Sequence, residues 1–292
     1  METINKTVSS LANTSSKLPK VAIIGAGVCG ILSARHLKDV ADIKVYESKE
    51  DIGGIWLYTE FSERNHPDLD SNAYYNLYKN LHSSLYHSLL TNIPKECMTF
   101  KDFYHSKETP YIMKSEVFHE YMKSYVNSYD LSKYISLNTT VTSLKVKDEA
   151  DHRYEITSVP TQVSQDSEPK TDYFDYVLIC NGHFTVPNVP DFEGRDTFEG
   201  TQFHMHELRK LEPHEFDDKN VLIVGAWVSA NDLIVNIMYR EETRDLVHPK
   251  KIFLTSRDTS AMEKSEDYAE AIERGQLVIK PGNVSKITKD TV

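Results

Sequence analysis

The sequence predicts an α/β protein with Rossmann-like dinucleotide-binding domains, because a buried strand, a glycine turn and a helix follow one another twice. The first copy spans residues 20–37 and the second spans residues 220–238. Each copy leads into another strand, as the nucleotide-binding β-α-β unit requires. Two such units about 200 residues apart indicate two nucleotide sites, with one domain inserted into the other.

The composition excludes several classes of protein. A length of 292 residues suits about two domains. The formal charge of −11 argues against a nucleic-acid surface, which would need a basic stripe. The mean hydropathy of −0.48 is typical of a soluble protein, and no apolar run approaches the roughly 20 residues of a membrane span.

The cysteines and the first residues indicate a reducing compartment. Cys29, Cys97 and Cys180 are far apart and form no C-x-x-C pair, so neither a redox dithiol nor a zinc knuckle is predicted. Residues 1–19 are polar and lack the hydrophobic core of a secretion signal, so we expect a disordered tail and a cytoplasmic protein.

The remaining elements follow from periodicity. Helical spacing predicts helices at 115–129 and 263–274. Apolar runs and alternation predict strands at 43–47, 141–146, 154–159, 251–257 and 277–280, and a single buried strand within 172–182.

The first turn, Gly25-Ala26-Gly27-Val28-Cys29-Gly30, has the G-x-G-x-x-G spacing. In this pattern the first glycine makes the turn, the second lets the backbone approach a pyrophosphate, and the third allows helix and strand to pack closely. Glu47 ends the next strand, where a carboxylate suits a ribose diol and repels a 2′-phosphate. The first site therefore favours FAD or NAD.

The second turn departs from this spacing. Gly225 is retained, but Trp227 and Ala230 replace the second and third glycines, and a tryptophan is not obviously compatible with close pyrophosphate approach. The following strand ends in Thr255-Ser256-Arg257 without a carboxylate. Because arginine can give paired hydrogen bonds to a phosphate, NADP is preferred here, with an exposed surface cation as the alternative for Arg257.

Four further segments resemble the flavin-containing monooxygenase family, with fungal members the most similar. They are G-G-I-W at 53–56, the segment 86–98 with its T-N-x-P-K-E-x-M pattern, C-N-G-H-F at 180–184, and F-x-G-x-x-x-H at 198–204. The resemblance extends from about residue 20 to the last residue. It implies a disordered tail at 1–19, an FAD-binding domain at 20–195 and an incomplete NADPH-binding domain at 196–292.

The resemblance also implies the chemistry and the site. NADPH would reduce FAD, O2 would form a flavin C4a-hydroperoxide, and this would oxygenate a small sulfur or nitrogen nucleophile. Asn92 is the expected catalytic residue because a carboxamide near the flavin can stabilise a peroxide; its alternative is a turn before Pro94. The expected cofactor-binding residues are Gly25, Gly27, Val28, Cys29, Gly30, Glu47, Gly54, Ile55, Trp56, Thr91, Asn92, Val141, Gly225, Ser229, Ala230, Asn231, Asp232 and Arg257.

Two of these interpretations have open alternatives. Trp56 is equally expected as ordinary core beside Gly54, and His204 is expected as a satisfied buried histidine. Leu208 stands where the family signature has an aromatic residue, so the subclass rests on the T-N-x-P-K-E segment.

The end of the chain raises a second hypothesis. Family members continue beyond this length, so we expect a C-terminal truncation that lacks the return of the FAD domain. The alternative function is then an inactive fragment that binds nucleotide weakly or associates with a full-length relative. A flavin disulfide reductase shares the layout, but the isolated cysteines exclude its usual form. We expect that the protein binds no metal and no nucleic acid and has no membrane span. Homo-oligomerisation and peripheral association with the endoplasmic reticulum are left open.

Overall fold

The computed structural model describes residues 18–60, 83–148, 153–161, 168–240 and 245–289. Clustering of contacts divides the chain into two compact units. The first unit comprises Met1–Gly54 and Glu120–Gly182, and the second comprises Ile55–His119 and His183–Val292. The predicted domain limits at 195 and 196 stay a prediction.

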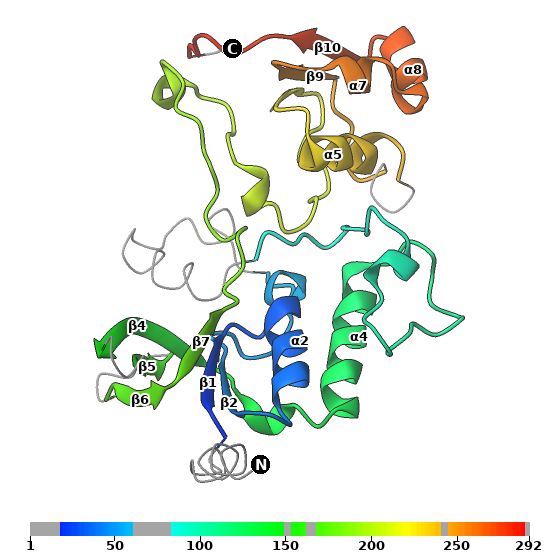
Figure 1. Cartoon of the computed structure of the whole chain (residues 1–292). Coiled ribbons are helices and arrows are strands. Elements are labelled where there is room, and N and C mark those ends of the chain that lie inside the picture. Colours follow the sequence, from blue (N-terminus) through cyan, green and yellow to red (C-terminus); the bar gives the residue numbers. More distant parts are fainter. Residues whose placement is uncertain (1–17, 61–82, 149–152, 162–167, 241–244, 290–292) are drawn as a thin grey trace, which may run out of the picture. The chain divides into compact units, whose positions relative to one another are not determined.

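The first unit contains a parallel sheet whose strand order is β3-β2-β1-β7. All three pairings in this sheet are parallel. The helix α2 lies beside β1 and β2, as Figure 1 shows. The strands are β1 (Lys20–Ile24), β2 (Asp42–Tyr46), β3 (Ile135–Ser136) and β7 (Tyr176–Ile179), and the helices nearby are α2 (Val28–Leu37), α4 (Ser115–Ser128) and the 3-10 turn η4 (Ser132–Tyr134).

A second, antiparallel sheet belongs to the same unit. It has the order β4-β5-β6, with β4 (Thr139–Asp148), β5 (Arg153–Pro160) and β6 (Lys170–Phe174). Ile156 and Phe174 of this sheet pack with Ala22 and Tyr46 of the parallel sheet in one buried cluster. The two sheets therefore share a core.

The predicted single strand within 172–182 is wrong. The chain forms β6 in the antiparallel sheet, passes through Asp175, and then forms β7 in the parallel sheet. The change occurs at Asp175, which exchanges two hydrogen bonds with Lys20 at the start of β1. The backbone N–H of Asp175 donates to the carbonyl of Lys20, and the backbone N–H of Lys20 donates to the carboxylate of Asp175. β7 is also not buried, since Tyr176 and Ile179 are 60% and 64% exposed.

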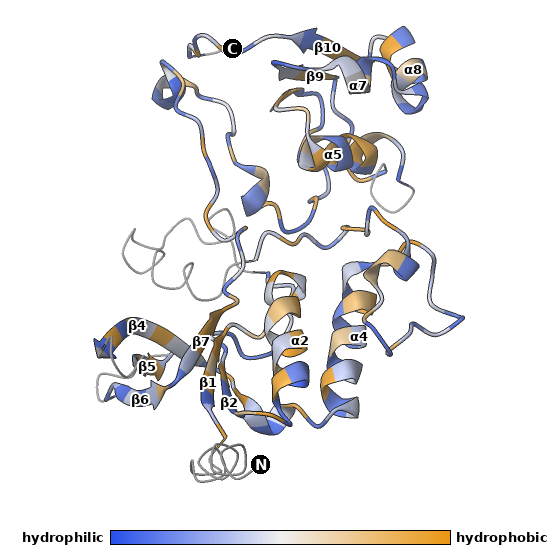
Figure 2. Cartoon of the chain, viewed as in Figure 1, coloured by the Kyte–Doolittle hydropathy of each residue, from blue (hydrophilic) through white to orange (hydrophobic). Residues whose placement is uncertain are grey.

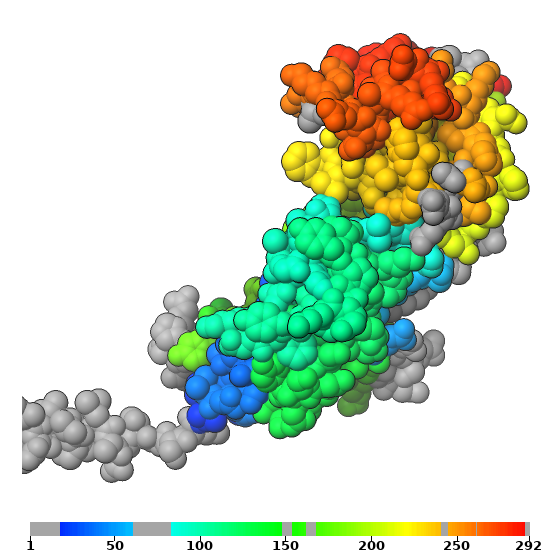
Figure 3. All heavy atoms as spheres, turned by 90° about the vertical axis from the view of Figure 1, so that its right-hand side faces the viewer, coloured from blue at the N-terminus to red at the C-terminus, as the bar shows by residue number. Residues whose placement is uncertain are grey.

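The second unit contains a three-stranded parallel sheet of order β10-β9-β8. Helix α5 is hydrophobic along much of its length (Figure 2) and contributes Leu233, Ile234 and Ile237 to the core of this unit. In Figure 3 the atoms of α8 and β10, orange to red, lie against those of α5, in yellow, and Tyr268 and Leu277 join the same core. The elements are β8 (Asn220–Val224), α5 (Val228–Met238), β9 (Lys251–Ser256), α7 (Ser260–Glu263), α8 (Glu266–Glu273) and β10 (Leu277–Pro281).

Short 3-10 turns connect the long segments of the second unit. They are η1 (Gly54–Trp56), which begins at the division between the units, η3 (Lys95–Met98), η5 (Arg195–Thr197) and η6 (Met205–Glu207). The two parallel sheets, each with a helix after its first strand, confirm the predicted α/β class and the two Rossmann-like β-α-β units.

Candidate functional site

The first glycine turn is built for close backbone approach. A side chain at Gly30 would bring its Cβ to 1.8 Å from the carbonyl oxygen of Gly25, so only glycine allows helix α2 to pack this near strand β1. Gly27 is different, since its nearest neighbour would be the Cα of Gly54 at 3.5 Å. A Cβ on Gly27 would thus make an ordinary van der Waals contact with Gly54, and the approach of a pyrophosphate to this backbone stays a prediction.

The amino end of α2 suits an anion. Ile31 donates the first helical hydrogen bond to Gly27 at 3.0 Å, so the N–H groups of Val28, Cys29 and Gly30 have no partner within the helix. The first turn of α2 carries no acidic residue. These three predicted residues therefore offer donors and the positive end of the helix dipole to a phosphate.

Glu47 is 5% exposed, and its carboxylate stabilises the first glycine turn. Its Oε2 accepts from the N–H of Ala26 at 2.7 Å, and its Oε1 accepts from the N–H of Lys49 at 2.9 Å. The hydroxyl of Ser48 also donates to Oε1, at 3.3 Å, so three of the roughly four lone-pair positions of the carboxylate are in use and one remains for a ribose hydroxyl. Glu47 therefore fixes the turn, and its contact with a ribose stays a prediction.

Gly54 lies against the first turn. It has φ +59°, and a Cβ there would stand 3.0 Å from the Cα of Gly27. Gly53 donates its N–H to Ala26 at 3.0 Å, and Lys49 donates to the carbonyl of Gly54 at 3.2 Å. The G-G-I-W segment and the G-x-G-x-x-G turn therefore meet at these glycines.

Ile55, Trp56 and Val141 occupy separate surroundings. In the second unit Ile55 is 39% exposed, and the Trp56 ring lies edge-on to Phe118 with centroids 4.8 Å apart. Val141 lies in β4 and packs against the cluster around Tyr46 in the first unit. The aromatic contact of Trp56 favours the core interpretation for that residue.

The second turn keeps the backbone geometry of the first. Gly225 has φ +106°, and its N–H donates to Thr255 at 2.8 Å, as Gly25 donates to Tyr46 at 2.7 Å. Trp227 is 82% exposed, so its side chain lies in solvent and is not packed into the core of the unit. The turn therefore forms without burying this indole.

Helix α5 begins after Trp227 with Val228, Ser229 and Ala230 and has no acidic residue in its first turn. Asn231 donates the first helical hydrogen bond, at 3.1 Å to Trp227. The amino end of α5 therefore repeats the anion-binding geometry of α2.

Arg257 follows β9 and is exposed, with its Nε 3.3 Å from Oδ1 of Asn283. The neighbouring acid, Asp258, was missed by the sequence analysis. Its carboxylate accepts from both the N–H and the hydroxyl of Ser260, at 3.0 and 2.7 Å, and these hydrogen bonds lower its pKa. Asp258 is exposed and stays negatively charged, so this strand end carries a cation and an anion side by side, and selection of a 2′-phosphate by Arg257 stays a prediction.

Asn231 and Asp232 differ from the other predicted nucleotide-binding residues because protein groups engage their side chains. Asn231 accepts a hydrogen bond from the hydroxyl of Tyr268, and Asp232 accepts one from the hydroxyl of Tyr86. Arg240 pairs with the other oxygen of Asp232 at 3.3 Å. Nucleotide binding by these two side chains stays a prediction.

The T-N-x-P-K-E segment places Asn92 on the surface of the second unit. Thr91 is buried and exchanges two hydrogen bonds with Met113, at 2.8 and 2.9 Å. Asn92 follows it, is exposed, and among the described residues its carboxamide makes no hydrogen bond. Lys95 donates to the carbonyls of Ser106, Lys107 and Thr109 and so closes the loop behind it.

The F-x-G-x-x-x-H signature leads into a buried cluster. Nδ1 of His204 accepts from the N–H of His206 at 3.1 Å, and burial lowers the pKa of His204. Burial, with the charge of Arg209 beside it, lowers the pKa of His206 to about 4. Leu208, at the aromatic position of the signature, is 2% exposed and part of the core.

Arg209 is a residue that the sequence analysis missed. It is 2% exposed and donates to the carbonyls of Leu85 and His206. A basic residue soon after the signature histidine was the available signal, but its burial depends on segments far apart in the sequence.

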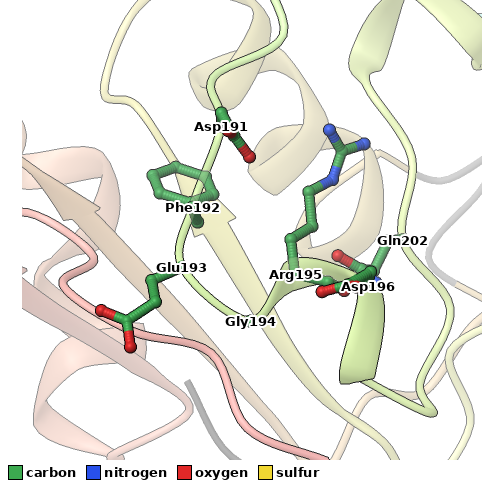
Figure 4. Close-up of a pocket in the computed structure, with 7 residues that line it drawn as sticks. All are labelled: Asp191, Phe192, Glu193, Gly194, Arg195, Asp196 and Gln202. Carbon is green, nitrogen blue, oxygen red and sulfur yellow. The ribbon is translucent and has the colours of Figure 1, made fainter.

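A pocket of about 580 Å³ lies in the turn before η5 (Figure 4). Its lining contains none of the predicted site residues and consists of Asp191, Phe192, Glu193, Gly194, Arg195, Asp196 and Gln202. Lys286 pairs with Glu193 at 2.7 Å, and Ile287 donates to the carbonyl of Glu193 at 2.8 Å. We assign no role to this pocket.

Within the described ranges, no group of three or more His, Cys, Asp or Glu side chains could hold a metal ion. A search of the same residues for a helix long and apolar enough to cross a membrane finds none.

Comparison with known proteins gives consistent matches. Residues 18–263 match the family described as flavin-binding monooxygenase-like. Trimethylamine monooxygenase of Pelagibacter ubique is 33% identical over 228 residues, which cover 74% of this chain and 47% of that protein. Flavin-containing monooxygenase 5 of Rattus norvegicus is 32% identical over 82% of this chain and 40% of its own length. The chain thus spans about half or less of the length of these relatives.

Two solved structures have a similar fold. The crystal structure of Tmm from Pelagibacter sp. aligns with a TM-score of 0.72 and 26% identity, covering 92% of this chain and 56% of that one. S-allyl-L-cysteine S-oxygenase from Allium sativum aligns with a TM-score of 0.67 and 25% identity, covering 90% and 55%.

Proposed function

Because this chain belongs to the flavin-binding monooxygenase-like family, we propose that it works as an FAD- and NADPH-dependent monooxygenase of small nitrogen or sulfur nucleophiles. The observation that carries this proposal is the pair of glycine turns, each followed by a helix with no acidic residue in its first turn. Two such turns suit two dinucleotides. The acid Glu47 after one and the cation Arg257 after the other suit FAD and NADPH respectively.

The names of the relatives support the substrate class. One similar protein is a trimethylamine monooxygenase and another is an S-allyl-L-cysteine S-oxygenase. Both names describe a soft nucleophile with a lone pair on nitrogen or sulfur. The reaction proposed for this chain adds one oxygen atom of O2 to that lone pair and releases the other as water. NADPH supplies a hydride and solvent supplies a proton.

Bound FAD would supply the redox chemistry and the activation of O2. The chain's own residues would bind and orient the cofactors. Val28, Cys29 and Gly30 would donate N–H groups to the FAD pyrophosphate, and Glu47 would accept from its ribose. The amino end of α5 would bind the NADPH pyrophosphate in the same way.

Asn92 would act on the transferred oxygen. Its carboxamide has two donor hydrogens and an acceptor, and it is exposed at the end of a segment whose preceding residue, Thr91, is held by Met113. A donor on a fixed backbone can stabilise developing negative charge without first being reorganised.

A spectrum tests this function directly. The purified chain, supplied with FAD, is expected to retain a bound-flavin absorbance that bleaches when NADPH is added without oxygen. Admitting oxygen with trimethylamine or a thioether should then restore the spectrum and produce the oxide in proportion to the NADPH consumed. A monodisperse chain that stays colourless after FAD is added contradicts the enzyme proposal.

A second candidate is a chain that binds nucleotide without completing the reaction, or that works together with a full-length relative. The exposure of apolar side chains on two strands favours it. Tyr176 and Ile179 of β7 are 60% and 64% exposed, and Leu222 and Val224 of β8 are 36% and 48% exposed. Flavin binding without bleaching by NADPH, or product formation only when a full-length relative is added, would support this candidate. A cytoplasmic location, peripheral membrane association and homo-oligomerisation stay predictions.

A further inference from the structure

The segment that precedes Asn92 is attached to helix α5, through Asp232, and to the residue pair that follows the helix, through Arg240. The hydroxyl of Tyr86 donates to Oδ2 of Asp232, and Nη1 of Arg240 donates to the carbonyl of Ser88. Tyr86 is 7% exposed and belongs to the same buried core as Leu233 and Ile234 of α5. Tyr86 lies six positions before Asn92 in the chain.

The two attachment points are joined to each other. Arg240 pairs with Oδ1 of Asp232 at 3.3 Å and donates to Oδ1 of Asn236 at 2.7 Å. Asn236 in turn donates to the backbone carbonyl of Asp232 at 2.7 Å. Asp232 and Asn236 are four residues apart on one face of α5, and Arg240 follows the end of the helix and reaches back to both. The side chains of Arg240 and Asp232 are only 13% and 20% exposed, so water screens their interaction weakly.

The hydroxyl of Tyr86 remains a donor throughout the physiological pH range. Burial and the nearby charge of Asp232 raise the pKa of Tyr86 well above its usual range, while Arg240 opposes this effect. The hydroxyl therefore stays protonated and available as a donor to Asp232.

The rest of the segment is held on its other sides. Arg209 donates to the carbonyl of Leu85 and accepts from the N–H of His87 at 2.7 Å. Thr91 exchanges two hydrogen bonds with Met113. Displacement of Tyr86 or Ser88 would thus be transmitted along the chain to Asn92, because little of the backbone between them is free to absorb it.

We propose that Asp232 and Arg240 are positioning residues that link the amino end of α5 to Asn92. This inference rests on the proposed function, in which α5 binds NADPH and Asn92 acts on the transferred oxygen. Asp232 is the fifth residue of α5, one turn from the N–H groups of Val228, Ser229 and Ala230. A nucleotide that orders this end of the helix would also order residues 85–92, so Asn92 would be held in place when the hydride donor is bound.

Amide hydrogen exchange of the full chain tests the link without relying on turnover. Tyr86→Phe removes only the hydroxyl, and Tyr268→Phe is the matched control, because the hydroxyl of Tyr268 also donates to α5, at Asn231, but not to the segment before Asn92. Arg240→Lys is a second variant that keeps the charge but loses the two-armed geometry that reaches Ser88 and Asp232 together.

Without nucleotide, we expect residues 85–92 to exchange about fivefold to tenfold faster in Tyr86→Phe and Arg240→Lys than in the wild type and in Tyr268→Phe. Saturating NADP+ should slow exchange at both 228–230 and 85–92 in the wild type and in the control. In the two test variants it should slow exchange at 228–230 alone. With FAD and substrate present, the fraction of oxidised NADPH recovered as hydrogen peroxide should rise in the test variants only.

The outcomes separate the two proposals. NADP+ that protects 228–230 but leaves 85–92 unchanged in the wild type would overturn the link and leave the proposed function standing. Equal exchange of 85–92 in Tyr86→Phe and Tyr268→Phe would overturn it as well. Protection of neither region would contradict the second nucleotide site and, with it, this inference.

Discussion

Gly27 and Gly54 stand back to back at the first nucleotide turn, with the Cα of Gly27 only 3.0 Å from where a Cβ on Gly54 would lie. This contact brings the G-x-G-x-x-G turn and the G-G-I-W segment together. A methyl group would have different effects at the different glycines of the turn, because its surroundings differ from one glycine to the next.

We predict that Gly27→Ala keeps the fold, because the added methyl group would make only an ordinary contact with Gly54, and that it weakens FAD binding about tenfold or more, because the proposed pyrophosphate site needs close approach to this backbone. FAD titration by fluorescence quenching measures the loss. Gly30→Ala is the contrasting variant. Its Cβ would stand 1.8 Å from a carbonyl oxygen, and we expect a loss of stability of at least about 3 kcal/mol. Equal FAD affinity in Gly27→Ala and the wild type would contradict this assignment.

Glu47→Gln should weaken both the turn and FAD binding. The carboxylate accepts from two backbone N–H groups, and a carboxamide would direct its own NH2 at one of them. We expect a loss of about 1–3 kcal/mol in the free energy of unfolding and a weaker FAD complex. Denaturant unfolding and FAD titration measure the two effects. Glu50→Gln, at an exposed position three residues away, is the control and should change neither.

Arg257→Gln should reduce the preference for NADPH over NADH by about tenfold to a hundredfold, because a charge-assisted pair with the 2′-phosphate is lost. The ratio of kcat/KM for flavin reduction with the two nucleotides measures this preference. Arg274→Gln removes an exposed arginine that pairs with Glu270 and should leave the ratio unchanged. A ratio that does not move in Arg257→Gln would indicate an ordinary surface cation.

Acid should destabilise the fold through His206. Its pKa of about 4 lies below the 6.5 of an unperturbed histidine, so the folded chain keeps it neutral where the unfolded chain already binds a proton. Stability from this residue is therefore present above pH 6.5 and is lost as pH falls toward 4, at up to about 1.4 kcal/mol per pH unit. His206→Gln should show a shallower decline over this window in denaturant unfolding. His36→Gln, at an exposed position, should keep the wild-type slope.

Lys95→Met should open the loop that follows Asn92. The ammonium group donates to the carbonyls of Ser106, Lys107 and Thr109, and methionine cannot replace these hydrogen bonds. We expect limited proteolysis to cut residues 101–109 several times faster in this variant, because local opening exposes the backbone. Lys101→Met, on the same surface, should be cut at the wild-type rate.

Sequence reasoning was most successful where neighbours along the chain determine the structure. The strands around both glycine turns, the helix at Ser115–Ser128 and the strand at Leu277–Pro281 all follow from local periodicity, and all were predicted within one or two residues. The family resemblance, built on short ordered motifs, was confirmed by the match over residues 18–263. The residue-level roles in the site stay predictions.

Sequence reasoning failed where neighbouring residues pair with strands that are far apart in the sequence. A single buried strand was predicted within residues 172–182, but β6 pairs with β5 and β7 pairs with β1, and the residues next to Asp175 give no local signal of this change. Asp232 has a distant partner too. The resemblance implies nucleotide binding for it, which stays a prediction, and the structure adds a contact of its carboxylate with Tyr86, 146 residues earlier.

The sequence by itself determined the class of fold, the two turns, the acid after one and the cation after the other, because glycine spacing and strand–helix periodicity are local properties of the chain. Only the tertiary structure decided that Trp227 points to solvent, that Lys95 closes a loop, and that Arg209, Tyr86 and Arg240 hold the segment before Asn92. These facts depend on which distant carbonyls and carboxylates meet each side chain. Such meetings are set by the packing of the whole unit rather than by the order of neighbouring residues.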